Sequence, residues 1–287
     1  MAYAKPLKIP HVQGTTTLDV PPSKVVVLDF ATIDTLNTLG VQVAGVPTAP
    51  ILPTRLKNYS KKAFAAGSAF EPNYEAIYSA KPDLIIVSDR SAPKYSMVSR
   101  IAPTIDLTPN NKDLMGSIEH NVLLLSQIFN KQVIAKDRLQ KLHSSINLLK
   151  EKSFKQGTGL VVMTTGGKLS AYGPGSRFGI IHDTFGIKPA DAQLKVSVHG
   201  QAISYEYILK RNPDWIFVID RDAAIGQEGE SAQRLLDNAL IHRTKAWKNN
   251  HIIYLNTLNW YFLDSVGLTA IQENVNDLIR IFNERSR

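Results

Sequence analysis

The sequence contains no cysteine among its 287 residues. The chain therefore cannot form disulfides, thiolate metal sites or iron–sulfur clusters, and it has no cysteine nucleophile. No stretch approaches the roughly 18 consecutive apolar residues that a transmembrane helix needs. The first residues, Met1-Ala2-Tyr3-Ala4-Lys5, lack the apolar core of a signal peptide. Two interpretations stay open, a cytoplasmic protein and an exported protein whose targeting segment has been removed.

Signatures of common enzymes are also missing. The sequence has no GxxxxGK[ST] phosphate loop, no HExxH zinc helix and no GxSxG nucleophile elbow. Its seven histidines are scattered, and none forms a close pair at ligand spacing. The net charge of +8 is not gathered into a run of basic residues, which argues against a tail that binds nucleic acid. We therefore expect neither an enzyme nor a nucleic-acid partner.

Two segments that lie 131 residues apart resemble each other. Residues 74–90 read YEAIYSAKPDLIIVSDR, and residues 205–221 read YEYILKRNPDWIFVIDR, with nine of seventeen positions identical. Each copy predicts a short helix, a turn at the Pro-Asp pair and a strand buried on both faces. A repeat of this length indicates that the chain consists of two related halves.

Each repeated strand ends in an Asp-Arg pair, which suggests a binding site. In open α/β sheets, ligands bind beyond the carboxyl ends of the strands, so Arg90 and Arg221 would each face a ligand. Arg177, in a Gly-rich loop of the second half, is a third candidate. Guanidinium groups keep their charge and repel one another, so three of them around one ligand require an anion. The alternative is that each pairs with a local carboxylate such as Asp89 or Asp220.

The hydrophobic periodicity predicts an α/β protein with two lobes. Each lobe is expected to contain a central, mainly parallel sheet flanked by helices, and one long helix is expected to join the lobes. No Pro or Gly occurs between Ser117 and Phe154, which predicts a stiff connection and modest closure around a ligand. The expected boundaries are residues 1–130 for the N-terminal lobe, 131–155 for the connecting helix and 156–287 for the C-terminal lobe.

Several local predictions are specific enough to be compared with a structure. We expect a hairpin at residues 3–20, a strand at 41–46, loops at 47–59, 165–179, 191–204 and 256–262, and helices at 231–248 and 264–283.

The two E-x-I-x-x-x-x-P-D-Φ-I motifs, the stiff central helix and the aromatic loop near the end resemble class III periplasmic binding proteins. The resemblance covers about residues 15–285. Such proteins deliver iron–siderophores, haem or cobalamin to ABC importers. It implies a periplasmic monomer, with or without a lipid anchor, and a membrane ABC transporter permease as its partner. A nitrogenase-like enzyme with a comparable fold would need cluster cysteines, which are absent.

Within that family, the chain is most similar to catecholate-siderophore binders of the enterobactin-uptake type. The resemblance implies that Arg90, Arg177 and Arg221 bind an anionic ligand and that His199 and Tyr261 bind its metal. A tetradentate bis-catecholate leaves two positions of Fe(III) open, and imidazole and phenolate are both known iron ligands. The alternatives are a loop histidine bonded to backbone and a tyrosine that packs its aromatic loop.

The function implied is the capture of an anionic ferric catecholate siderophore, with a tetradentate siderophore expected. Fe(III) would enter as part of the siderophore complex, and no intrinsic cofactor is expected. The alternative cargoes for the same fold are haem, cobalamin and a hydroxamate siderophore. Three arginines favour a cargo with substantial negative charge over these alternatives.

Glu75 and Glu206 occupy equivalent positions at the start of the two repeat helices. In the family, one acidic residue in each lobe docks onto the transporter, and these two glutamates match those positions. The alternative is that each glutamate stabilises its helix, because a negative charge is favourable at a helix N-terminus.

Overall fold

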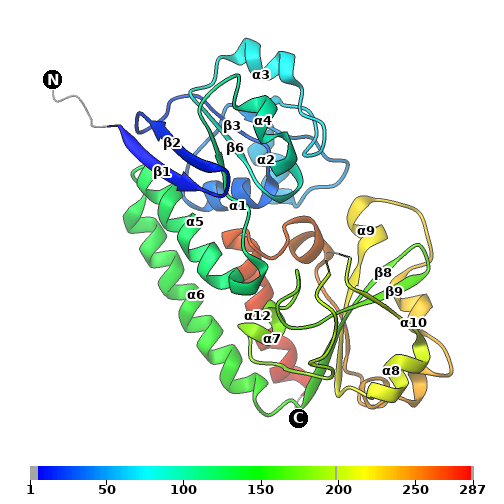
Figure 1. Cartoon of the computed structure of the whole chain (residues 1–287). Helices are drawn as coiled ribbons and strands as arrows, with labels where there is room; N and C mark the ends of the chain where they lie inside the picture. Colours follow the sequence, from blue (N-terminus) through cyan, green and yellow to red (C-terminus); the bar gives the residue numbers. More distant parts are fainter. Residues whose placement is uncertain (1–5, 198, 286–287) are drawn as a thin grey trace. The chain divides into compact units, whose positions relative to one another are not determined.

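The computed structural model describes residues 6–197 and 199–285 (Figure 1). Residues 3–5 of the predicted hairpin and Val198 of the predicted 191–204 loop lie outside the described residues. The chain divides into two compact units, each of which is described by itself below. Unit 1 comprises Met1–Asn110, Gly116–Leu139 and Gly267–Thr269, and unit 2 comprises Asn111–Met115, Gln140–Val266 and Ala270–Arg287.

Among the described residues, unit 1 contains a sheet of five strands in the order β5-β4-β3-β6-β7, and every neighbouring pair is parallel. The central strands are buried on both faces, as their unbroken apolar runs predict. A separate antiparallel hairpin precedes the sheet. The strands are β1 (Leu7–His11), β2 (Gly14–Leu18), β3 (Val25–Val27), β4 (Gly45–Val46), β5 (Phe64–Ala65), β6 (Leu84–Val87) and β7 (Thr104–Asp106).

The helices of unit 1 follow the parallel strands. One of these helices was not predicted from the sequence. The 47–59 segment contains a helix, α2, after Pro53, because a proline at the helix start removes no internal hydrogen bond. The strand predicted at 41–46 is reduced to Gly45–Val46. The elements are α1 (Phe30–Thr38), α2 (Thr54–Ser60), α3 (Tyr74–Ala80), η1 (Asp89–Lys94), α4 (Tyr95–Val98), η2 (Asn111–Asp113, assigned to unit 2) and α5 (Leu114–Ile128).

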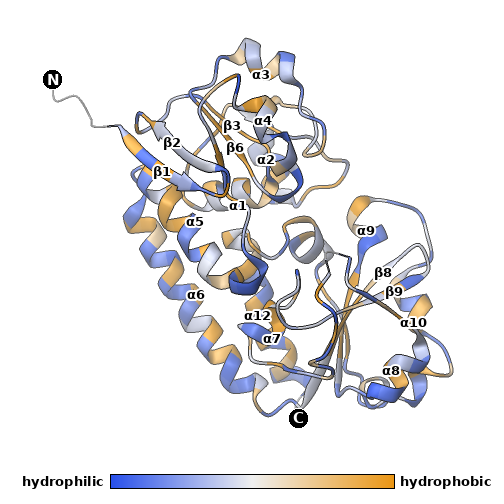
Figure 2. Cartoon of the chain, in the orientation of Figure 1, coloured by the Kyte–Doolittle hydropathy of each residue, from blue (hydrophilic) through white to orange (hydrophobic). Residues whose placement is uncertain are grey.

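Helix α6 (Gln132–Ser153) is 22 residues long, which confirms a long central helix. It carries one buried apolar stripe, and hydrophilic and hydrophobic residues alternate along it (Figure 2). This is the amphipathic pattern that 3.6 residues per turn produces. The buried residues of the stripe are Ala135, Leu139, Leu142, Ile146 and Leu149.

Unit 2 contains a mixed sheet in the order β11-β9-β8-β12-β13, with β10 also paired to β8. The pairs β8–β12, β12–β13 and β8–β10 are parallel, and β9 pairs with β8 and β11 in antiparallel fashion. The parallel sheets of the two units confirm the predicted fold class. The strands are β8 (Thr158–Thr165), β9 (Lys168–Tyr172), β10 (Lys188–Pro189), β11 (Gln201–Ile203), β12 (Trp215–Asp220) and β13 (Ile252–Tyr254).

Two of the predicted loops in unit 2 contain strands. In the 165–179 segment, Gly166 and Gly167 have φ values of +51° and +74° and form the turn that joins β8 to β9, where Thr165 pairs with Lys168. A Gly-Gly pair with positive φ is a common two-residue hairpin turn. The 191–204 segment contains β11, which pairs with β9 as the outermost strand.

The predicted helix at 231–248 is divided into three short pieces, because side chains cap the backbone inside it. Asn238 accepts hydrogen bonds from the N–H groups of Leu240 and Ile241, and Thr244 accepts one from Trp247. Such local bonds compete with a continuous helix. The helices of unit 2 are α7 (Ile180–Asp183), α8 (Tyr205–Arg211), α9 (Arg221–Ile225), α10 (Ala232–Leu236), η3 (Ile241–Arg243) and α11 (Lys245–Lys248).

The last helix begins later than predicted. Asp264 and Ser265 have φ values of +50° and +57°, which a helix does not tolerate. Helix α12 (Leu268–Arg285) therefore starts four residues after the expected position, and the predicted 256–262 loop contains one turn of π-helix, η4 (Leu258–Phe262).

The internal repeat has a common structure in the two units. Helices α3 and α8 are each seven residues long, each ends at a left-handed residue, and each leads into a buried strand. The Asp of each Pro-Asp pair accepts hydrogen bonds from backbone N–H groups at the start of a neighbouring strand. Asp83 accepts hydrogen bonds from the N–H groups of Ser23 and Lys24 at 2.8 and 2.9 Å, and Asp214 accepts one from Thr158 at 2.8 Å.

Candidate ligand-binding site

Three of the predicted site residues meet at the carboxyl edge of the unit 2 sheet. Arg221 is the first residue of α9, directly after β12, and Arg177 lies between β9 and α7. Tyr261 belongs to the π-helical turn η4. Asp220 accepts hydrogen bonds from the N–H groups of Ala223 and Ala232, so it orders the start of α9.

Arg221 contacts both the hydroxyl group and the aromatic ring of Tyr261. Its Nε donates a hydrogen bond of 2.9 Å to the phenolic oxygen, and its guanidinium carbon lies 5.7 Å from the ring centre. Its Nη1 donates to Thr165 Oγ1 at 3.2 Å and lies 3.7 Å from a carboxylate oxygen of Asp222. An arginine has five N–H donors, so these contacts leave donors for a ligand.

Arg177 is held more tightly than Arg221. Its Nε donates to Asp264 at 2.6 Å, its Nη2 donates to the same carboxylate, and Nη2 also donates to the carbonyl of Tyr261 at 2.9 Å. Its guanidinium carbon lies 4.7 Å from the Tyr261 ring centre. The side chain of Arg177 is 18% exposed and that of Asp264 is 14% exposed, against 34% for Arg221.

These contacts show which carboxylate lies next to each of the two arginines. Both have a carboxylate neighbour, Asp264 for Arg177 and Asp222 for Arg221, and neither is the Asp220 considered from the sequence. Arg177 is therefore closely paired and only slightly exposed, while Arg221 is the more exposed and the more loosely paired cation. The two guanidiniums both contact the ring of one tyrosine, Tyr261.

Four residues of this site were not predicted from the sequence. Thr165, Asp222 and Asp264 contact the arginines, and Tyr172 lies beneath them on β9. Tyr172 is 1% exposed, and burial raises its pKa to about 12, although nearby Arg177 lowers it. The signal in the sequence was weak, because these positions are recognised only once the strand-end loops are folded together.

His199 lies on the segment between β10 and β11 and is exposed. Its backbone N–H donates to the hydroxyl of Ser197 at 3.3 Å. Among the described residues, its ring makes no hydrogen bond or ring contact with the arginines or Tyr261, and no cluster of three or more His, Asp or Glu side chains could hold a metal ion. The structure thus brings together Arg177, Arg221 and Tyr261 and leaves His199 on the surface.

Arg90 is part of unit 1 and shows that the two Asp-Arg pairs are not equivalent. Strand β6 ends at Val87, Ser88 caps η1, and Asp89 has a φ of +40°. In the second copy the strand continues to Asp220, because the longer β8 supplies a pairing partner as far as Thr164. Arg90 is half-buried at the carboxyl edge of the unit 1 sheet.

Glu75 and Glu206 occupy the same position in their helices. Each is exposed and is the second residue, after caps in which Asn73 and Ser204 accept hydrogen bonds from the N–H groups of Ala76 and Tyr207. The pKa of Glu206 is lowered by its own backbone N–H and by the hydroxyl of Ser204. Both glutamates are therefore solvent-facing carboxylates at helix N-termini.

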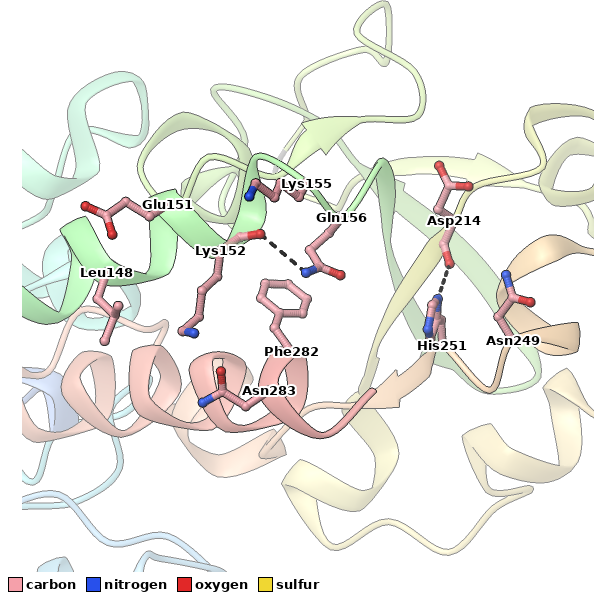
Figure 3. A pocket seen from close by; sticks show the side chains of 10 residues that line it. All are labelled: Leu148, Glu151, Lys152, Lys155, Gln156, Asp214, Asn249, His251, Phe282 and Asn283. Atoms are coloured by element: carbon pink, nitrogen blue, oxygen red, sulfur yellow. Dashed lines mark hydrogen bonds between the residues drawn. The ribbon is translucent and has the colours of Figure 1, made fainter. Parts of the chain in front are cut away.

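A separate pocket of about 630 Å³ lies at the opposite edge of the unit 2 sheet. Gln156, Asp214 and His251 line it (Figure 3). Asp214 and His251 directly precede β12 and β13, and Gln156 lies two residues before β8. Its floor includes Phe282 of α12, and Lys152 of α6 borders it. This pocket contains none of the predicted site residues.

Comparison with known proteins identifies the family. Residues 25–257 match the periplasmic binding protein family. The petrobactin-binding protein YclQ of Bacillus subtilis is 42% identical over 261 residues, covering 90% of this chain and 81% of YclQ. The ferric-anguibactin-binding protein FatB of Vibrio anguillarum is 33% identical over 96% of this chain and 87% of its own.

Solved structures of related proteins are also similar to this chain. The crystal structure of YclQ has a TM-score of 0.91 and covers 96% of this chain and 99% of its own, with 39% sequence identity. The periplasmic catecholate-siderophore-binding protein VctP of Vibrio cholerae has a TM-score of 0.89 and 31% identity, covering 95% of this chain and 99% of its own.

The chain thus belongs to the periplasmic binding protein family, whose members are substrate-binding proteins and not enzymes. This confirms both the family resemblance and the absence of an enzymatic function. Within the described residues, each helix is either too short or too polar to cross a bilayer.

Proposed function

We propose that this chain captures an anionic ferric catecholate siderophore outside the cytoplasm and delivers it to the permease of an ABC importer as a monomer. One observation carries the proposal, namely that the phenolic oxygen of Tyr261 accepts a hydrogen bond from Arg221 while two guanidiniums contact its ring. Proteins of the same family support the choice of cargo, because YclQ and FatB are named for petrobactin and ferric anguibactin, and VctP for catecholate siderophores.

The chemistry of Tyr261 fits a ferric cargo. A bound trivalent cation favours the deprotonated form of a phenol. A tetradentate bis-catecholate leaves two coordination positions open, so Tyr261 would supply one and His199 the other. His199 is exposed on its segment, so its ring is accessible to an incoming ligand.

The charges favour a catecholate over the other cargoes considered. Ferric catecholates are net negative, and Arg221 has unused N–H donors with which to meet them. We propose that Arg90 also binds the anionic ligand and that Arg177 acts by holding Tyr261 in place. A hydroxamate complex or cobalamin has less negative charge and would gain less from these side chains.

Delivery to a transporter rests on Glu75 and Glu206. Both carboxylates are exposed at equivalent helix starts, which makes them available for basic pockets on a permease. The alternative, stabilisation of the helix dipole, requires no partner. Measurement of transporter ATPase activity with Glu75→Gln and Glu206→Gln separates these alternatives, since only docking predicts a loss of stimulation at unchanged siderophore affinity.

A titration tests the cargo. The chain has three tryptophans, so quenching of their fluorescence by ferric bis-catecholate, haem, cobalamin and a ferric hydroxamate can be compared directly. The proposal predicts saturable quenching at the lowest concentration with the catecholate. Equal or tighter binding of the hydroxamate or of haem would contradict it.

A further inference from the structure

The C-terminal end of α6 presents an aromatic side chain to solvent. Phe154 directly follows the helix and is 88% exposed. Its backbone N–H donates to the carbonyl of Lys150 at 3.1 Å, so the residue continues the helical turn and has a defined position. A single exposed apolar residue is ordinary on a protein surface, and its significance depends on what surrounds it.

Lysines flank Phe154 in the sequence. Residues 150–155 read KEKSFK, which sets three lysines against the single carboxylate of Glu151. A fourth lysine, Lys188 of β10, pairs with Thr158, which is four residues after Phe154 at the start of β8. The neighbouring Gly186 is close to Lys150, since a Cβ added to it would lie 3.4 Å from the Lys150 Cγ. We call Lys150, Lys152, Phe154, Lys155 and Lys188 the basic tip.

Local stability explains only part of this arrangement. Lysines in the last turn of a helix interact favourably with its dipole, which accounts for Lys150 and Lys152. That effect does not involve Lys188, which is on a strand, and it gives no reason for an exposed phenylalanine. Leu148 adds a second apolar group, 44% exposed, beside Lys152 and Lys155 in the pocket of Figure 3.

We propose that the basic tip binds the surface of an anionic bilayer. Lysines near a membrane attract anionic headgroups, and an aromatic ring inserts at the boundary between headgroups and acyl chains. Both components are present here on one short segment. A soluble anion would use the lysines but would gain nothing from an exposed ring, whereas a lipid interface uses both. This interaction would hold the protein near a membrane independently of its cargo.

Vesicle binding by the whole protein tests the proposal. We expect co-sedimentation with vesicles containing phosphatidylglycerol, none with pure phosphatidylcholine, and release as the salt concentration rises. Replacing each of Lys150, Lys152 and Lys155 by glutamine should weaken binding about fivefold per lysine. Phe154→Ser should also weaken it, while Phe70→Ser, an aromatic residue 60% exposed beside Glu71, should not.

A second measurement reports directly on insertion and requires no loss of binding. In Phe154→Trp, lipids brominated on their acyl chains should quench the added fluorescence, and in Phe70→Trp they should not. Absence of binding to anionic vesicles, equal binding to neutral ones, or equal quenching of the two variants would overturn the proposal. Binding that survives all three lysine substitutions would overturn it as well.

Discussion

The Nε of Arg221 donates a hydrogen bond of 2.9 Å to the phenolic oxygen of Tyr261. This contact joins the end of the repeated strand β12 to the π-helical turn η4, two segments 40 residues apart in sequence. It holds the phenolic oxygen of Tyr261 beside a permanent cation. The proposed function depends on this pair more than on any other contact.

Tyr261→Phe removes the proposed iron ligand and keeps the ring between its arginine neighbours. Removing a group that merely supports a metal ligand lowers affinity by about 10- to 100-fold. We expect the affinity for a tetradentate ferric bis-catecholate to fall by at least that much. A hexadentate catecholate should be much less affected, because its iron is already saturated. Fluorescence titration of both ligands measures the difference, and an equal loss for both would contradict ligation.

Tyr172→Phe is the matched control for that experiment. Tyr172 is close to the same arginines, but burial raises its pKa to about 12, so it stays protonated at neutral pH. Its hydroxyl has Met163 sulfur as a partner at 3.9 Å, a weak contact. We expect this variant to bind both ligands as the unmodified protein does.

His199→Ala tests the second proposed ligand. If the segment that carries His199 closes over the ligand, this variant should also weaken binding of the tetradentate complex selectively, and the double variant with Tyr261→Phe should be weaker than either single one. Because His199 is exposed, its removal should leave the thermal unfolding temperature unchanged. Unchanged affinity in the double variant would show that neither side chain binds the iron.

Asp264→Asn should expose the structural role of Arg177. The carboxylate and the guanidinium are both largely buried, and removing one partner of such a pair costs about 3 kcal/mol in the free energy of unfolding. Glu284→Gln is the control, because its pair with Arg280 is half exposed and worth less than about 1 kcal/mol. Urea unfolding of both variants measures the contrast, and similar values would contradict a structural role for Asp264.

Asp83→Asn should destabilise the protein in a pH-dependent manner. Burial alone would raise the pKa of Asp83, but hydrogen bonds from Ser23 and Lys24 outweigh it and lower the pKa below 3.8. A lowered pKa means that the stabilisation is complete above about pH 4 and is lost as the pH falls through the folded-state pKa. At pH 7 we expect a loss of about 1–2 kcal/mol.

The same reasoning applies to Asp214, whose pKa is also lowered, through hydrogen bonds from Thr158 that outweigh its burial. For both aspartates, urea unfolding at pH 7 and at pH 3 should show that the difference from the unmodified protein shrinks in acid. A difference that is the same at both pH values would mean that the ionised carboxylate is not what stabilises the strand.

The parallel sheets and the repeat were predictable because their signals are local. An unbroken apolar run such as Trp215–Val218 indicates a strand covered on both faces, and the Pro-Asp pair marks the turn before it. The role of Asp83 and Asp214 was missed, since it depends on a strand start that lies about 60 residues away in sequence.

The site was predictable only in part. The strand end pointed to Arg221, the Gly-rich loop to Arg177, and the family resemblance added Tyr261, and the structure brings these three together. Asp264 was not foreseen because its position depends on a backbone conformation with positive φ that sequence patterns do not reveal. The hairpin turn at Gly166 and Gly167 was predicted only as part of a loop at 165–179, although that pair is a known turn signal.

The central claim is that Tyr261 binds the iron of a captured ferric catecholate. The absorption spectrum of the protein mixed with Fe(III) and a bis-catecholate tests it most directly. The account predicts a charge-transfer band shifted from that of the free complex, and a return toward the free position in Tyr261→Phe. A band identical to that of the free complex, or one shifted equally in the variant, would contradict the claim.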